Sequence, residues 1–128
     1  MKNGTPDAGD ILWLNVGPGA GSEQDGYRPA LVLTDAEFNE LTGRFVGLPI
    51  TSTIHGWESE IPIGGLATPC VAMADQVTTL SLAGRVWRHK GEAAAAEELE
   101  AAKFAVAGIL ELSPAAQWKR PSPVPTAP

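Results

Sequence analysis

The sequence is poor in the residues that build disulfides and metal sites. Cys70 is the only cysteine among the 128 residues, which excludes an intrachain disulfide and a zinc site made of several cysteines. The two histidines, His55 and His89, lie far apart and do not have the spacing of metal ligands. We therefore expect neither a metal ion nor another cofactor. Cys70 lies in an apolar run, which predicts a buried and unreactive thiol.

Long hydrophobic runs are missing as well. No apolar run approaches the roughly 20 residues that span a bilayer. The first residues also lack the hydrophobic stretch of a secretory signal peptide. The sequence therefore predicts no membrane association, and we expect the protein to be cytoplasmic.

Basic residues are fewer than acidic ones. The chain has 15 acidic and 9 basic residues, which gives a formal net charge of −6. This total counts against a nucleic-acid partner, because affinity for nucleic acid depends mainly on neutralising phosphates. A local basic surface is nevertheless compatible with it, because several basic side chains cluster within six positions. They are Arg85, Arg88, His89 and Lys90.

The glycine-rich segment from Gly17 to Gly21 could be taken for a phosphate-binding loop. Such a loop runs directly into a helix whose N-terminus holds the phosphates. Here the segment runs into Ser-Glu-Gln-Asp-Gly-Tyr-Arg-Pro, which is not a helix start, and the chain contains no Gly-Lys-Ser or Gly-Lys-Thr. We therefore exclude a nucleotide-binding loop.

Short apolar runs bounded by turn residues predict a chain built mainly of β-strands. Strands are expected at 11–16, 30–34, 45–50, 58–63, 71–74 and 85–89. The capping-box spacing of Thr34 and Glu37, followed by Gly43, predicts a short inserted helix. Pro49 suggests an edge strand or a bulge. Helical spacing of apolar residues from Glu92 onward predicts a C-terminal helix.

These elements predict one small domain at 9–112 and a flexible, proline-rich tail at 113–128. The strands do not alternate with helices as they would around a parallel sheet. The expected fold class is therefore mainly β (α+β), with a small, strongly bent sheet or barrel and peripheral helices.

Several motifs occur in order between residues 9 and 112. Gly-Asp-Ile-Leu-Trp begins at Gly9, Gly-Ser-Glu-Gln at Gly21, and Arg-Pro-Ala-Leu-Val-Leu at Arg28. Pro-Ile-Thr ends at Thr51, Ala-Asp-Gln-Val begins at Ala74, and Glu-Glu-Leu follows at 97–99. In this order the motifs resemble the MazF/PemK (Kid) toxin family. The resemblance implies an SH3-like β-barrel, a homodimer and a cognate antitoxin that blocks the active groove. It also implies cleavage of single-stranded RNA without metal, which leaves a 2′,3′-cyclic phosphate and a 5′-hydroxyl.

The resemblance places the main catalytic arginine at Arg28. A guanidinium stays charged and its planar fork matches phosphate geometry, so stabilisation of the charge on the reacting phosphate is its expected role. Thr51 matches the second catalytic residue, whose hydroxyl can donate to a phosphate oxygen. Glu23 has two equally supported roles, as the base for the 2′-hydroxyl or as the partner that orients Arg28.

Five further residues are expected to bind the substrate. Ser22 and Gln24 offer hydrogen bonds to phosphate or base edges from a loop. Ser52 directly follows Thr51. His55 and Trp57 have rings on which an unpaired base can stack.

The sequence departs from the family where Asn15 and Gly17 stand in place of acidic residues. Two alternatives therefore stay open. In the first, the chain is a CcdB-like toxin that binds DNA gyrase and cleaves nothing, which would suit its acidic charge. In the second, it is a degenerate dimeric module that binds RNA or protein without catalysis.

Overall fold

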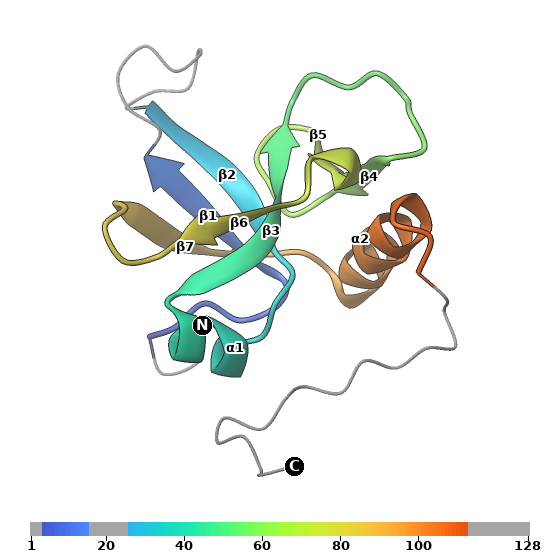
Figure 1. Cartoon of the computed structure of the whole chain (residues 1–128). Coiled ribbons are helices and arrows are strands. Elements are labelled where there is room, and N and C mark those ends of the chain that lie inside the picture. Colours follow the sequence, from blue (N-terminus) through green and yellow to red (C-terminus); the bar gives the residue numbers. More distant parts are fainter. Residues whose placement is uncertain (1–3, 16–25, 113–128) are drawn as a thin grey trace, which may run out of the picture.

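The computed structural model describes residues 4–15 and 26–112. The predicted tail at 113–128 lies outside the described residues. Figure 1 shows a bent sheet with helices beside it. In chain order the elements are β1 (Asp10–Asn15), β2 (Tyr27–Val32), α1 (Ala36–Thr42), β3 (Arg44–Thr51), β4 (Glu60–Ile63), β5 (Cys70–Met73), a 3-10 turn (Ala74–Gln76), β6 (Thr78–Ser81), β7 (Trp87–Ala93) and α2 (Ala96–Ile109).

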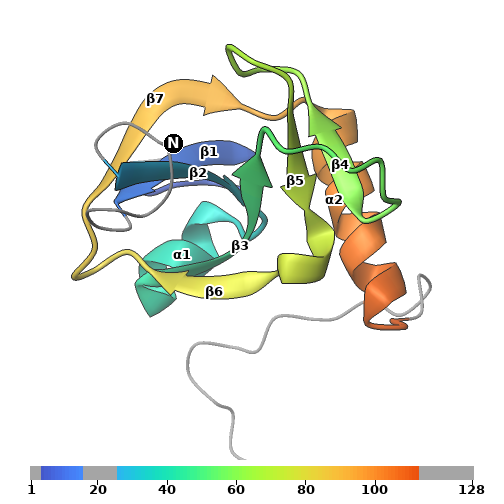
Figure 2. The ribbon, with the colours of Figure 1, turned by 90° about the horizontal axis from the view of Figure 1, so that it is seen from above.

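The seven strands pair antiparallel in the order β4-β5-β3-β2-β1-β7, and β6 pairs with β3 beside this path. Figure 2 shows how strongly the sheet bends, with β4, β5 and α2 to one side of the other strands. The predicted α+β class is confirmed. The barrel is not closed, because no pairing within the described residues joins β7 to β6 or to β4.

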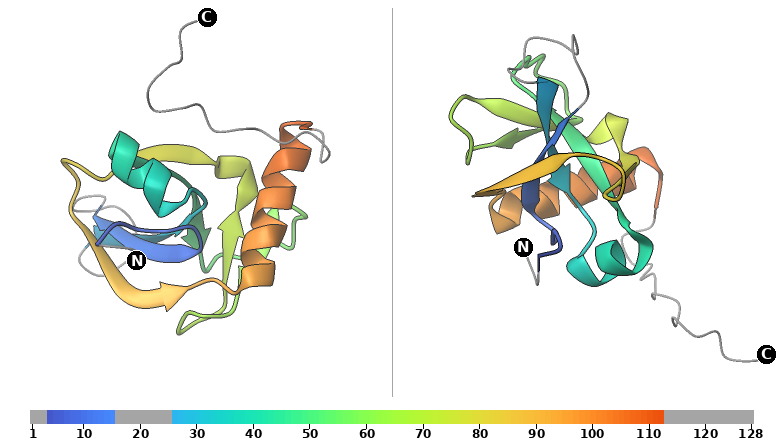
Figure 3. Two further views of the ribbon diagram at one scale, coloured as in Figure 1. Left: turned by 90° about the horizontal axis from the view of Figure 1, so that it is seen from below. Right: turned by 90° about the vertical axis from the view of Figure 1, so that its left-hand side faces the viewer.

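Two apolar cores cover the two faces of the central strands. Ile11, Leu31 and Leu48 belong to the core beneath α2, and Leu12 and Phe45 belong to the core on the opposite face. Coverage of both faces explains why β1 and β2 read as nearly continuous apolar runs. α2 lies alongside β4 and β5, whereas α1 lies at a separate end of the molecule (Figure 3). The predicted burial of the single thiol is confirmed.

The predicted start of α1 is wrong by one residue. Asp35 is the N-cap, and its Oδ1 accepts the backbone N–H of Phe38 at 2.9 Å. The Thr34 hydroxyl instead donates to Asn39 Oδ1 at 2.6 Å and accepts the N–H of Val46 at 3.0 Å. Thr34 therefore joins the helix to β3 rather than capping it. Gly43 ends the helix with a φ of 69°, as predicted.

Pro49 does not mark an edge strand. β3 is a central strand that pairs with β6 up to Gly47, with β2 up to Pro49, and with β5 from Ile50. Pro49 falls between the last residue paired with β6 and the first paired with β5. Its missing N–H is tolerated there because β3 changes partner on one side at this point.

The chain between β5 and α2 also differs from the prediction. β6 was not predicted, because three of its four residues are polar and exposed or partly exposed. β7 continues to Ala93, so Glu92 lies in a strand and the last helix starts at Ala96. The boundary between β7 and α2 was misplaced because acidic residues occur on both sides of it, Glu92 in the strand and Glu97 in the helix. Within the described residues, no helix is long and apolar enough to cross a membrane.

Candidate active site

Arg28 lies near the start of β2, close to residues 16–25, which are outside the described part of the chain. Its backbone is opposite Leu14 of β1, and its side chain is half-buried. Because side chains alternate along a strand, Arg28 shares a face with Ala30 of β2. Ala30 belongs to the core on the Phe45 side of the sheet. The guanidinium therefore extends from the end of that core.

Thr51 is the last residue of β3. The pairing of β2 with β3 ends where Ala30 lies opposite Pro49, two residues before Arg28 on one strand and two residues before Thr51 on the other. Opposed residues share a face, and alternation along each strand puts Arg28 on the face of Ala30 and Thr51 on the face of Pro49. In Figure 1 the tip of β3 and the start of β2 lie at the same edge of the molecule. We call it the Arg28–Thr51 edge.

The Thr51 hydroxyl already has a local partner. Its Oγ1 accepts the backbone N–H of Thr53 at 3.1 Å, the capping contact expected of a threonine at a strand end. A hydroxyl has one hydrogen to donate and two lone pairs to accept with. Accepting from Thr53 therefore leaves the hydrogen of Thr51 for another acceptor.

The 52–59 loop continues from Thr51 and carries Ser52, His55 and Trp57, all of them exposed. The rings of His55 and Trp57 are stacked, with their centroids 4.2 Å apart and their planes 9° from parallel. Gly56 between them has a φ of +83°, a backbone conformation that residues other than glycine rarely adopt. The structure thus places these three predicted residues on the loop that leaves the Arg28–Thr51 edge.

Glu60, the first residue of β4, organises this loop and was not singled out from the sequence. Its Oε1 accepts the backbone N–H groups of His55 at 3.0 Å, Gly56 at 2.8 Å and Trp57 at 3.3 Å. Its Oε2 lies 3.0 Å from Nδ1 of the His55 ring. Only the burial of Glu60, 8% exposed, distinguishes it from Glu58 beside it, and the sequence does not reveal that burial.

The protonation of Glu60 reflects these contacts. Burial of the carboxyl disfavours its ionised form. The hydrogen bonds from the His55 side chain and from the backbone of Gly56, His55 and Trp57 outweigh that effect. The net result holds the pKa of Glu60 below its ordinary value of 4.5.

The lowered pKa of Glu60 predicts a pH-dependent contribution to stability. The contribution is present above the ordinary pKa and is lost as the pH falls through the lowered pKa, because the folded state favours the ionised form. We expect the free energy of unfolding of the wild type to fall more steeply than that of Glu60→Gln between about pH 5 and pH 2. Urea unfolding at a series of pH values measures both slopes. Parallel slopes would contradict the prediction.

The basic cluster predicted at 85–90 is divided between two faces of the sheet. The guanidinium of Arg88 lies over the Tyr27 ring, 4.1 Å from its centroid, and Lys90 Nζ lies 4.1 Å from the Trp13 ring centroid. The Trp13 Nε1 donates to Glu92 at 2.6 Å. Trp13 is opposite Arg88 in the sheet, whereas Arg28 is opposite the next residue, Leu14. Arg88 and Lys90 therefore lie on the face turned away from Arg28.

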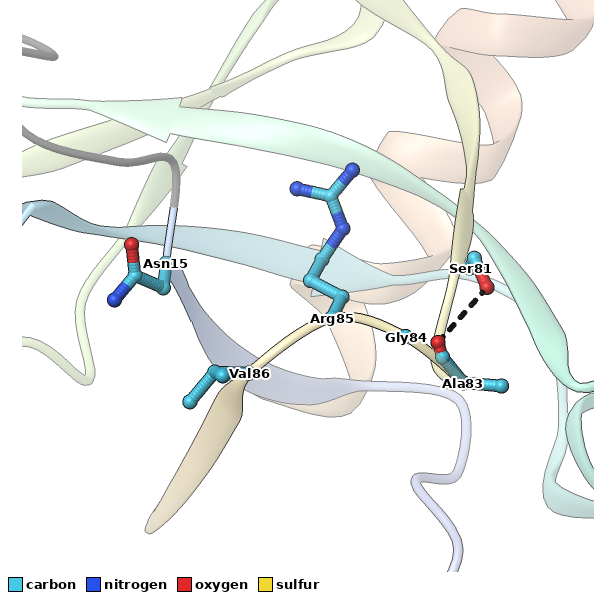
Figure 4. A pocket seen from close by; sticks show the side chains of 6 residues that line it. All are labelled: Asn15, Ser81, Ala83, Gly84, Arg85 and Val86. Carbon is cyan, nitrogen blue, oxygen red and sulfur yellow. Dashed lines mark hydrogen bonds between the residues drawn. The ribbon is translucent and has the colours of Figure 1, made fainter.

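His89 and Arg85 do not join Arg88 and Lys90. His89 Nε2 lies 3.5 Å from Asp10 Oδ1 and is largely buried. Arg85 lies in the turn before β7 and lines an open hollow with Asn15 and Val86 (Figure 4). Its Nε is buried and has no hydrogen-bond partner within the part of the chain that the structure describes. The four basic residues that cluster in the sequence therefore do not form a single basic surface.

Three of the predicted site residues, Ser22, Glu23 and Gln24, lie outside the described residues. Among residues 4–15 and 26–112, no three histidine, cysteine, aspartate or glutamate side chains gather as metal ligands would. The described part of the predicted site therefore consists of Arg28, Thr51 and the 52–59 loop.

Comparison with known proteins completes this picture. Residues 7–110 match the family described as PemK-like, MazF-like toxin of type II toxin-antitoxin system. The chain is 39% identical to the endoribonuclease toxin MazF of Escherichia coli K12 over 98 residues, which cover 77% of this chain and 87% of that protein. It is also similar to a crystal structure of MazF from Deinococcus radiodurans, with 35% identity, a TM-score of 0.71, and coverage of 84% of this chain and 97% of the other. A MazE-MazF structure from the same organism matches with 30% identity, a TM-score of 0.72, and coverage of 85% and 98%.

Proposed function

Because the chain belongs to the PemK-like, MazF-like toxins of type II toxin-antitoxin systems, we propose that it is an endoribonuclease. It cleaves single-stranded RNA at short motifs without a metal ion and leaves 2′,3′-cyclic phosphate and 5′-hydroxyl ends. The observation that carries the proposal is the pairing of β2 with β3, whose last pair, Ala30 with Pro49, lies two residues from Arg28 on one strand and two from Thr51 on the other. A charge and a hydroxyl are thereby available to the same phosphate.

The proposed reaction needs no group beyond those of the chain and the RNA. The 2′-oxygen attacks the phosphorus, the bond to the 5′-oxygen breaks, and one proton leaves the 2′-hydroxyl while another reaches the 5′-oxygen. Negative charge builds up on the non-bridging oxygens in between. Arg28 stabilises that charge, because its guanidinium donates two parallel hydrogen bonds and remains cationic throughout.

Thr51 assists Arg28 in this proposal. Its hydroxyl accepts from the backbone of Thr53, which orients it and leaves its hydrogen to donate to a non-bridging oxygen. A preorganised donor of this kind contributes about 3 kcal/mol to the transition state. Glu23 acts either as the base for the 2′-hydroxyl or as the residue that orients Arg28. Ser22, Gln24 and Ser52 bind the RNA around this centre.

The endoribonuclease is favoured over a gyrase-binding toxin. The similar proteins include a MazF and a PemK of Escherichia coli, both named endoribonucleases, and the chain is 33% identical to the latter over 84 residues. The chain also has the arginine and threonine that RNA cleavage uses. A protein that only bound gyrase would have no need of that pair.

Cleavage of a long single-stranded RNA by the purified protein in EDTA tests the proposal. We expect fragments with 5′-hydroxyl ends, and sequencing of those ends gives the motif that is cut. Folded protein that leaves the RNA intact would overturn the proposal. Inhibition of gyrase supercoiling by the same preparation would then identify the alternative class.

We also propose that the protein is a cytoplasmic homodimer regulated by a cognate antitoxin. The antitoxin would compete with RNA by placing an acidic, disordered segment on the Arg28–Thr51 edge. The dimer is supported by α2 and the residues directly after it, where large apolar side chains are exposed although the inner face of the helix packs on the core. These are Phe104, Ile109, Leu110 and Leu112, with exposed fractions of 74%, 47%, 55% and 58%.

Substitution of Phe104 tests the dimer. A charged residue at the centre of an apolar interface loses the buried ring and leaves an unpaired charge, so Phe104→Asp should raise the dimer dissociation constant at least about tenfold. Sedimentation equilibrium over a range of concentrations measures it. Lys103→Asp, which introduces the same residue at an exposed neighbouring position, is the control. A wild-type protein that stays monomeric at high concentration would refute the dimer.

A further inference from the structure

The side chain of Glu60 accepts its hydrogen bonds from the 52–59 loop, the segment expected to bind RNA bases. The described hydrogen-bond partners of its side chain lie in three consecutive residues of the 52–59 loop, His55, Gly56 and Trp57. A carboxylate only accepts hydrogen bonds, so the Nδ1 of His55 carries the hydrogen in the 3.0 Å contact. The buried carboxylate of Glu60 thus fixes both the backbone of the loop and the ring of His55.

The 52–59 loop presents two aromatic rings to solvent. Trp57 is 57% exposed and His55 is 48% exposed at its side chain, yet their rings are already stacked at 4.2 Å. Exposed segments of seven consecutive residues, such as 52–58, sample many conformations unless something orders them. The carboxylate of Glu60 supplies that order, and the left-handed turn at Gly56 lets three successive N–H groups converge on it.

From this arrangement we infer that Glu60 is a positioning residue that assembles the His55–Trp57 stack into a platform for an unpaired base of the RNA. The inference rests on the proposed endoribonuclease function and deepens it. Aromatic faces bind bases of any sequence by stacking, and a platform formed in advance avoids the loss of loop entropy on binding. Thr51 directly precedes this loop, so a base held on the platform belongs to a nucleotide near the one that is cleaved.

Simple electrostatics predicts the opposite effect of removing Glu60. RNA is a polyanion, so loss of a negative charge near the binding site should strengthen binding. A platform that depends on Glu60 should instead be weakened by the same substitution. The sign of the change in affinity therefore separates the two explanations.

The experiment compares Glu60→Gln and Glu60→Ala with the wild type. Steady-state cleavage gives KM and kcat, and the Kd is measured for an RNA that carries a 2′-deoxy nucleotide at the cleavage position and cannot react. We expect KM and Kd to rise about tenfold in Glu60→Ala, with a smaller rise in Glu60→Gln and kcat within about twofold of the wild type. Glu58→Gln removes the neighbouring exposed charge and should raise neither constant.

A double-mutant cycle identifies the route of the effect. Trp57→Ala alone should weaken binding about as much as Glu60→Ala, and the two together should add little, because both remove one platform. Additive effects, or an unchanged or lower Kd in both Glu60 variants, would overturn the inference. A fall in kcat alone would also overturn it. Absence of cleavage by the wild type would instead count against the proposed function, and the Kd series would still test the platform.

Discussion

Arg28→Ala should lower kcat/KM for RNA cleavage by about 10³-fold or more, the largest effect expected of any single substitution in this chain. In the proposed mechanism the guanidinium acts where charge develops on the phosphate, so its removal should affect the transition state more than the ground state. Arg28→Lys should recover part of the activity, because an ammonium retains the charge but not the planar fork. Quantitative cleavage of a short fluorescent RNA measures all three proteins.

Arg44→Ala provides the matched control for Arg28. Arg44 is an exposed arginine at the first residue of β3, and Thr51 is at the other end of the same strand. Its loss changes the net charge by the same amount and should leave kcat/KM within about twofold. Equal losses in the two variants would show that the effect of Arg28 is a general effect of charge. Thermal unfolding of each variant separates loss of activity from loss of fold.

Phe45→Ala should destabilise the fold by about 3–5 kcal/mol. Phe45 is fully buried, and it packs in the core that includes Leu12, Leu14 and Val32. Removing its ring leaves a cavity that close neighbours fill only in part, since strands on both sides hold the backbone. Urea unfolding followed by circular dichroism gives the change in free energy.

Leu41→Ala is the control for Phe45. Leu41 lies on α1 and is 64% exposed, so its truncation should change the free energy of unfolding by less than about 0.5 kcal/mol. A similar loss in both variants would contradict the assignment of Phe45 to the core. Retention of wild-type stability in Phe45→Ala would contradict it as well.

The outline of the fold could be predicted from the sequence because its strands are short apolar runs separated by turn residues. The boundaries could not. At Thr34 and Asp35 two adjacent residues can both cap a helix, and only the contact between Thr34 and β3 decides which one does. At Pro49 a local rule about proline is overridden by a change of strand partner, which depends on residues distant in the chain.

Some residues of the candidate site could likewise be predicted from the sequence, and others could not. The motifs around Arg28 and Thr51 predict that both residues belong to the site, and the pairing of β2 with β3 ends two residues from Arg28 and two from Thr51. Glu60 could not be identified, because its importance comes from three N–H groups that point at it only once the loop is folded. The clustering of Arg85, Arg88, His89 and Lys90 in the sequence was misleading. Arg88 and Lys90 share one face of β7, alternation puts His89 on the other face, and Arg85 lies in the turn before the strand.

The central position of β3 also restricts how such a protein can be switched off. One strand pairs with β6, β2 and β5 in turn and contributes to both cores. Local unfolding releases an element at low free energy only if few contacts cross its boundary. Unfolding of β3 as a whole would therefore open both halves of the molecule together. We expect reversible control of the proposed activity to come instead from a molecule that covers the Arg28–Thr51 edge and leaves the fold intact.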